Sequence, residues 1–381
     1  MLPIALKSFH IKNYRGIIDT QIDNIPPDTQ WIFLTGENGF GKTSVLQALA
    51  IDLSVNTEEF NNAEKNNANF EISTEYIFHG QIHPKKEGYF YNKGELLSSN
   101  IGSDLIIAYG STRLRVSAAT SKEVLEQSSN IRSLFSNEIL LADIEEKFKD
   151  WYSNYSKGFE EIEKLFKSLL PRLGKISAPF NNATKESKVE YFETDSEGNL
   201  LEDGITFKNL AAGYKNIIAT VGDMIFRLGT VQNFNNYEDL EGIVLIDEFE
   251  LHLHPKYQKL FVQKLTELFP KIQFIVSTHS PIPLLGAPKN SVIINVSRTR
   301  EEGIKAELLD IDFSVLTPNA ILSSPIFGFQ DLIPESKTKD KMARSEDSYK
   351  EVLFNDLLDK QIDEYLTDEN KQELLDLLKI K

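Results

Sequence analysis

Four apolar residues, Trp31 to Leu34, run directly into a glycine-rich segment that closes with Gly-Lys-Thr. The pattern Gly-x-x-x-x-Gly-Lys-Thr lets backbone N–H groups surround a phosphate chain, while its lysine reaches the β and γ phosphates and its threonine binds Mg²⁺. Apolar residues recur at helical spacing from Val45 to Leu53, so the loop opens a helix. The segment predicts a strand, loop and helix that bind a nucleotide through Gly36, Glu37, Asn38, Gly39, Phe40, Gly41, Lys42, Thr43 and Ser44.

A second apolar run, residues 242–246, ends in two carboxylates, Asp247 and Glu248. A carboxylate at the end of a buried strand can hold Mg²⁺, and its neighbour can orient and polarise the attacking water. Such a run is often structural when it stands by itself. Together with the phosphate loop it is interpreted as a Walker B motif, so we expect Thr43 and Asp247 to bind Mg²⁺ and Glu248 to be catalytic.

A third apolar run ends in Ser277-Thr-His279-Ser-Pro281. A single histidine after a strand is more often structural. Because this one follows the Walker B motif on a further buried strand, we predict that His279 contacts the γ phosphate and, with Lys42 and Glu248, belongs to the catalytic residues.

These motifs together resemble the ABC-type ATPase heads of the RecF, SMC and OLD group. The resemblance covers about residues 4–300 and implies an α/β fold, an ABC-type P-loop head whose mixed sheet is flanked by helices. It also implies hydrolysis of ATP and a homodimer with ATP and Mg²⁺ at its interface. Residues 9–16 are similar to the amino-terminal Asn-Phe-Arg segment of this group, which implies that Arg15 contacts the nucleotide.

The group also carries a signature segment, Leu-Ser-Gly-Gly-Gln, that caps the γ phosphate bound by the partner subunit. The best match is Leu210-Ala-Ala-Gly213-Tyr-Lys215, which implies this role for Ala211 and Gly213. Because Ala211 replaces the serine, a hydroxyl is missing and backbone N–H groups at the helix N-terminus would bind the phosphate instead. Slow turnover or ATP-gated switching is therefore expected, and an ordinary strand-to-helix turn is the alternative.

The rest of the pattern predicts one head interrupted by a short helical segment. Strands are expected within residues 4–34, 70–78 and 105–109, helices within 121–173, a hairpin around 195–199 and a last strand hairpin over 291–309. We assign the head to 1–120 and 181–333, a helical insertion to 121–180 and a charged helical tail to 334–381. The tail either folds back on its own domain or docks another chain.

Composition limits the partners of this chain. A net charge of −16 argues against broad electrostatic binding of nucleic acid, although a local basic groove for DNA stays possible. No apolar run approaches the ~20 residues of a membrane span, and the absence of cysteine fits a cytoplasmic protein. Asp310 and Asp312 offer the acidic pair of a TOPRIM nuclease, but the Glu-Gly strand that should precede it is missing, so no nuclease domain is expected here.

We therefore expect a nucleotide-gated ATPase, dimeric or of higher order, that acts in bacterial anti-phage defence and controls a separate effector such as a nuclease. Two other functions stay open. One is a RecF-like DNA repair factor, for which salt-dependent DNA binding would be evidence. The other is a scaffold that binds ATP and hardly hydrolyses it because of Ala211, for which ATP-dependent dimerisation without turnover would be evidence.

Overall fold

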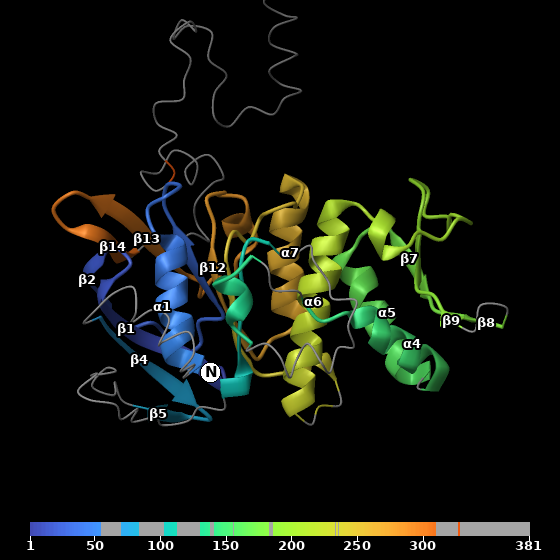
Figure 1. The fold of residues 1–381 in the computed structure, drawn as a ribbon, viewed down its shortest axis with the longest axis horizontal. Coiled ribbons are helices and arrows are strands. Elements are labelled where there is room, and N and C mark those ends of the chain that lie inside the picture. The colour runs from blue at the N-terminus through green and yellow to red at the C-terminus, as the bar shows by residue number, and fades with distance from the viewer. Residues whose placement is uncertain are drawn as a thin grey trace, which may run out of the picture. The chain divides into compact units, whose positions relative to one another are not determined.

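The computed structural model describes residues 1–54, 70–83, 103–112, 130–137, 141–154, 156–182, 186–232, 234, 236–309 and 327. Within them, a ten-stranded sheet has the order β5-β4-β1-β2-β14-β13-β3-β12-β11-β6 (Figure 1). Its strands are β1 Ile4–Tyr14, β2 Ile17–Ile22, β3 Trp31–Thr35, β4 Glu71–Phe78, β5 Gln81–His83, β6 Ile106–Tyr109, β11 Gly242–Ile246, β12 Ile272–Ser277, β13 Val292–Thr299 and β14 Gly303–Leu309.

The sheet is mixed, as the sequence predicts. Strands β13, β3, β12, β11 and β6 run parallel to one another, whereas β5, β4, β1, β2 and β14 form antiparallel pairs. Every residue of β3, β11 and β12 is buried. This burial explains their unbroken apolar sequences, because a parallel strand is covered on both faces.

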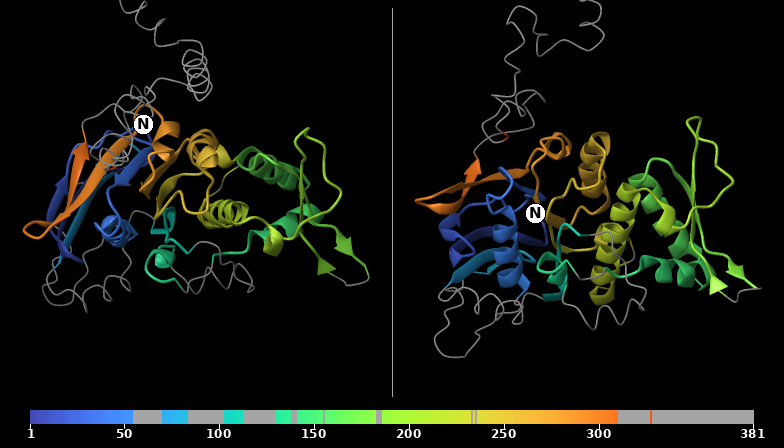
Figure 2. Two further views of the ribbon diagram at one scale, coloured as in Figure 1. Left: turned by 90° about the horizontal axis from the view of Figure 1, so that it is seen from above. Right: turned by 45° about the horizontal axis from the view of Figure 1, so that its top comes forward.

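Helices cover both faces of the parallel part (Figures 1 and 2). Trp31 and Phe33 of β3 point into a core that includes residues of four helices, whereas Ile32 and Leu34 point into a second core with α1 and the amino-terminal strands. The helices are α1 Lys42–Ser54, α4 Ile144–Asn154, α5 Ser156–Leu169, α6 Ala212–Val231 and α7 Pro255–Leu268. Short 3₁₀ helices span Ser103–Leu105, Arg132–Leu134, Phe207–Asn209, Tyr237–Asp239 and Pro283–Gly286.

The segment expected to be a helical insertion is only partly helical. Helices α4 and α5 confirm the helical spacing, but residues 173–177 form strand β7, Leu173–Ser177, which pairs antiparallel with β10, Glu190–Glu193. Tyr191 bridges to Ile205 and Thr194 bridges to Leu200, so the expected hairpin around residues 195–199 is present and its second arm is joined to its first by isolated bridges. Strands β8, Phe180–Asn181, and β9, Glu186–Ser187, form a further short pair.

The predicted strands before the phosphate loop and the last strand hairpin are confirmed by the pairs β1–β2 and β13–β14. None of the helices described is long and apolar enough to cross a membrane. The charged tail at 334–381, Asp310 and Asp312 lie outside the described residues.

Candidate nucleotide-binding site

The glycine-rich loop leaves the end of β3 and enters α1 through backbone conformations that favour glycine. Gly36, Gly39 and Gly41 have φ angles of 133°, 81° and 98°. A Cβ atom at Gly36 would overlap the carbonyl oxygen of Val296, and one at Gly41 would overlap the Ile304 side chain. Glu37, Asn38 and Gly39 are exposed, whereas Phe40 and Ser44 are half-buried. The loop is thus a tight turn with an exposed tip.

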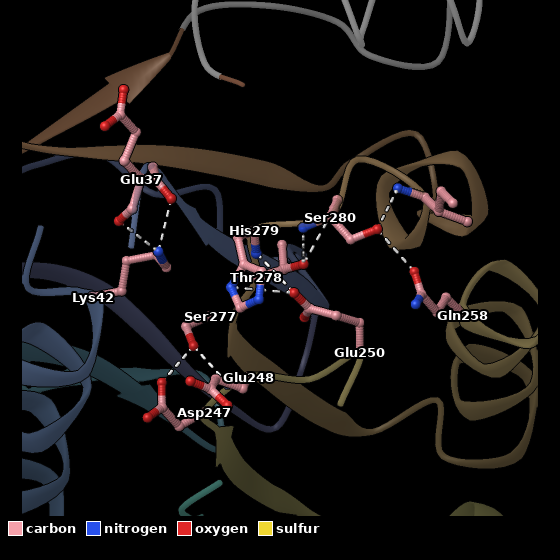
Figure 3. Close-up of polar contacts among 12 residues, drawn as sticks. Glu37, Lys42, Asp247, Glu248, Glu250, Gln258, Ser277, Thr278, His279 and Ser280 are labelled. Carbon is pink, nitrogen blue, oxygen red and sulfur yellow. Dashed lines mark hydrogen bonds and ion pairs between the residues drawn. The ribbon is translucent and has the colours of Figure 1, made fainter. Parts of the chain in front are cut away.

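Lys42 begins α1 and turns its amine back into this loop. Its Nζ donates hydrogen bonds to the carbonyl oxygens of Gly36 and Glu37 at 2.7 and 3.0 Å (Figure 3). Burial lowers the pKa of the Lys42 amine, against the opposing charges of the carboxylates of Glu250, Asp247 and Glu248. The loop therefore holds one cation among carbonyl oxygens, next to a group of anions.

Thr43 and Asp247 meet although 204 residues separate them in the chain. The Thr43 hydroxyl donates a hydrogen bond to Asp247 Oδ2 at 2.8 Å. Ser277, at the end of the strand that lies between β3 and β11, donates its hydroxyl hydrogen to Asp247 Oδ1. The backbone N–H of Asp247 donates to the carbonyl oxygen of Tyr109 on β6 at 2.8 Å. Asp247 is therefore oriented from the ends of β12 and β6 and from the first turn of α1.

Glu248 occupies a left-handed backbone conformation, with φ of 48°. Such a conformation is unfavourable for residues other than glycine and persists where surrounding bonds impose it. Here Ser277 imposes it, since its hydroxyl accepts from Glu248 N at 2.8 Å and its carbonyl accepts from Phe249 N at 3.0 Å. The turn leaves the Glu248 carboxylate half-exposed beside Asp247.

His279 stands two residues beyond β12, at the same edge of the sheet. Thr278 N donates to the carbonyl oxygen of Leu34 at 3.0 Å, which joins the end of β12 to the end of β3 just before the phosphate loop. The side chain of His279 is 39% exposed, and its Nδ1 lies 3.4 Å from Glu250 Oε1. Lys42, Glu248 and His279 therefore follow three neighbouring strands of one sheet, β3, β11 and β12.

Arg15 lies on the side of α1 and not at the tip of the loop. Its guanidinium donates a hydrogen bond to Gln47 Oε1 in the second turn of α1, and its φ is 45°. No hydrogen bond among the described residues joins Arg15 to residues 36–44. The turn after Arg15 is nevertheless close to the loop, because Gly16 and Gly41 both lie against the side chain of Ile304.

The signature candidate forms the first turn of α6. Ala211 is the N-cap residue, is exposed and provides no side-chain hydrogen bond to the helix. A Cβ atom at Gly213 would lie 2.8 Å from the carbonyl oxygen of His252, and Asn216 donates to the carbonyl of Leu251 at 2.8 Å. Among the described residues, no hydrogen bond joins Ala211 or Gly213 to residues 36–44. Within one chain, this segment lies against the loop after β11 and does not reach the phosphate loop through hydrogen bonds.

Sequence reasoning assigned no role to Ser277 or Glu250, which the structure brings into the same group. The signal for Ser277 was its place at the end of an apolar run, one position before Thr278. The signal for Glu250 was the spacing Glu-Phe-Glu after Asp247, which places a third carboxylate within three residues of it. Both side chains orient residues that the sequence did identify.

Several known proteins are similar to this chain over part of their length. "Septu protein PtuA" of Bacillus mycoides is 30% identical over 345 residues, which are 87% of this chain and 46% of that protein. "Retron Vc95 probable ATPase" of Vibrio cholerae is 42% identical over 118 residues, 30% of this chain and 21% of that protein. The chain spans less than half the length of these relatives.

The chain is also similar to a solved structure and to a protein family. The Smc head domain of Pyrococcus furiosus, bound to the C-terminal domain of ScpA, is 14% identical; the match covers 80% of this chain and 96% of that one with a TM-score of 0.48. The family model described as the AAA ATPase domain matches residues 5–95 and 122–282, which include Lys42, Asp247, Glu248 and His279. Since this match takes in more than half of the sequence, the chain belongs to the AAA ATPase domain family.

Proposed function

We propose that this protein binds ATP with Mg²⁺ and hydrolyses it to ADP and phosphate. The observation that carries the proposal is the 2.8 Å hydrogen bond between the Thr43 hydroxyl and the Asp247 carboxylate, directly after the glycine-rich loop. Hydroxyl and carboxylate oxygens are donors that suit Mg²⁺, which also takes water and phosphate oxygens. The residues present therefore fit this metal, which when bound would neutralise charge on the β and γ phosphates.

Each residue of the site has a role in this proposal. The backbone N–H groups of residues 36–44 and the Lys42 amine bind the phosphates, so the amine exchanges its carbonyl partners for phosphate oxygens. Thr43 and Asp247 hold Mg²⁺. Glu248 orients and polarises the attacking water, and His279 contacts the γ phosphate. Arg15 contacts the nucleotide from its position beside α1, at the edge of the site.

We further propose that hydrolysis takes place between two copies of the chain, in a homodimer or a larger assembly. The support is the exposed first turn of α6, whose unsatisfied N–H groups are a suitable anion site, and its lack of hydrogen bonds to residues 36–44 within one chain. In a head-to-tail dimer, Ala211 and Gly213 would face the γ phosphate held by the partner subunit. Nucleotide state would then control assembly.

The biological setting we propose is anti-phage defence, with the ATPase controlling a separate effector such as a nuclease. The support is similarity to a Septu protein and to retron ATPases, which belong to such defence systems. A 53-residue match to the RecF protein of Rickettsia typhi, at 45% identity, supports the ATPase part of the RecF-like alternative. The net charge of −16 makes duplex DNA a less suitable partner than a protein.

The test compares wild type with Glu248→Gln and Lys42→Ala in phosphate release and in light scattering with and without ATP and Mg²⁺. Wild type should release phosphate and dimerise with ATP. Glu248→Gln should dimerise and release phosphate at least about a hundredfold more slowly, because it lacks the group that polarises water. Lys42→Ala should do neither. If Glu248→Gln turns over as fast as wild type, the role given to Glu248 is wrong.

The same preparations separate the alternatives. ATP-dependent dimers without phosphate release from wild type would favour the scaffold. Tight duplex binding that weakens steeply between 50 and 200 mM salt would favour the RecF-like factor, since released counterions make such binding salt-dependent.

A further inference from the structure

Glu250 is a buried carboxylate at the edge of the site, and none of the roles above includes it. Its side chain is 8% exposed. One oxygen, Oε1, accepts a hydrogen bond from the backbone N–H of His279 at 2.9 Å. The other, Oε2, is fully buried and has no hydrogen-bond partner within the described part of the chain. Burial of a carboxylate with so few partners is unfavourable, so a cationic or proton-donating neighbour is expected to compensate it.

Two neighbours meet this description. Of the three carboxylates that act on the buried Lys42 amine, Glu250 has the largest effect on its pKa, in the direction opposite to burial. The second neighbour is the imidazole of His279, whose Nδ1 lies 3.4 Å from Oε1 (Figure 3). Glu250 thus acts on Lys42 through its charge, and on His279 through direct contact with its backbone N–H and its ring.

We propose that Glu250 is a positioning residue that fixes the tautomer of His279. A carboxylate next to one ring nitrogen stabilises an N–H at that nitrogen and sets which nitrogen faces the ligand. With the proton on Nδ1, Nε2 is the nitrogen presented to the nucleotide. The expected effect on turnover rests on the proposed function. The tautomer itself does not, because it can be observed in the nucleotide-free protein.

The nucleotide-free protein provides the first test. Nitrogen-15 NMR of the imidazole rings distinguishes the two neutral tautomers, and His279→Gln identifies the His279 signals among the six histidines. Wild type should show the proton on Nδ1. Glu250→Gln keeps the shape and an oxygen that accepts from His279 N but removes the charge, so it should shift His279 toward the Nε2–H tautomer. A wild-type signal from Nε2–H, or no change in Glu250→Gln, would overturn the proposal.

Turnover provides the second test, as a double-mutant cycle of Glu250→Gln and His279→Gln. Glu250→Gln should lower kcat about tenfold and change KM for ATP less than about threefold, because the oriented ring acts mainly in the transition state. In a protein that already carries His279→Gln, the same Glu250→Gln change should lower kcat less than about twofold. Equal losses in both backgrounds would show that Glu250 acts through another residue, such as Lys42.

Two controls keep the outcomes separate. Glu301→Gln, which alters an exposed carboxylate in the turn between β13 and β14, should leave kcat and the His279 signals unchanged. If wild type does not hydrolyse ATP at all, the proposed function fails, and the NMR comparison still decides the role of Glu250.

Discussion

Removal of the Asp223 carboxylate should destabilise the protein more than most single substitutions. Asp223 lies in the middle of α6 and is completely buried. Its oxygens accept hydrogen bonds from Tyr109 Oη and Ala142 N at 2.7 Å each and from Arg227 Nε at 2.8 Å. Tyr109 also connects this group to the site, because its carbonyl accepts from Asp247 N at 2.8 Å. Asp223 thus joins α6 to the end of β6, which contacts Asp247.

The magnitude follows from burial and charge. Arg227 is only 4% exposed, so Asp223→Ala leaves a buried guanidinium without this carboxylate, a change that costs about 3–5 kcal/mol. At about 2–4 °C per kcal/mol, the melting temperature should fall by roughly 10 °C. Tyr109→Phe removes one hydroxyl from the same group and should cost about 1 kcal/mol. Asp223→Ala with Arg227→Met removes both charges and should recover part of the loss.

Urea denaturation followed by circular dichroism measures these differences as changes in the free energy of unfolding. Val231→Ala, at the exposed end of the same helix, is a control that should change it by less than about 0.5 kcal/mol. An Asp223→Ala protein that loses under about 1 kcal/mol would refute the reasoning, since a buried ion pair that matters so little cannot hold α6 against β6.

Three further predictions concern other sites. Gly36→Ala places a methyl group against the carbonyl oxygen of Val296 at a φ of 133° and should lower the free energy of unfolding by about 2 kcal/mol or more, measured in urea. Lys42→Ala should weaken binding of a fluorescent ATP analogue at least about tenfold without lowering the melting temperature, because burial of this amine is unfavourable. Burial raises the pKa of Asp52 from 3.8 to about 7 against the hydrogen bond from Thr74, so between these values the folded state holds a proton that the unfolded state has lost. Stability should therefore fall as pH rises through this window, and Asp52→Asn should flatten the fall in melting temperature between pH 4.5 and 7.

The central part of the fold could be predicted because its signals are local. Uninterrupted apolar strands such as residues 242–246 indicate burial on both faces, and the glycines of the loop fix its turn regardless of context. The small sheet of β7 and β10 could not be predicted in the same way. Leu173-Gly-Lys-Ile-Ser alternates too briefly to distinguish a strand from the end of a helix, and it becomes a strand only because Tyr191 and its neighbours pair with it. Strand pairing over such a distance has no local signature.

The residues of the site also divide into those that local motifs predict and those that depend on the fold. Lys42, Thr43, Asp247 and Glu248 belong to motifs whose spacing carries the chemistry, so their convergence could be expected from the sequence. Ser277 could not be assigned in this way, because serine at a strand end has many uses. Its role depends on the order β3-β12-β11, which brings the end of β12 next to Asp247. Residues that orient others are recognised through geometry, and geometry depends on the sheet order.

Ala211 gives the last prediction, which separates the stability of α6 from its proposed function. As the N-cap of α6 with no side-chain hydrogen bond, Ala211 leaves helix N–H groups unsatisfied, and Ala211→Ser should stabilise the protein by about 0.5–2 kcal/mol. If this turn also caps the γ phosphate of a partner subunit, the added hydroxyl should raise kcat as well. Ala212→Ser adds the same hydroxyl one residue into the helix, where it cannot cap, and should change neither quantity. A more stable Ala211→Ser protein with unchanged phosphate release would mean that this segment is an ordinary helix start, and the dimer proposed above would then need another surface.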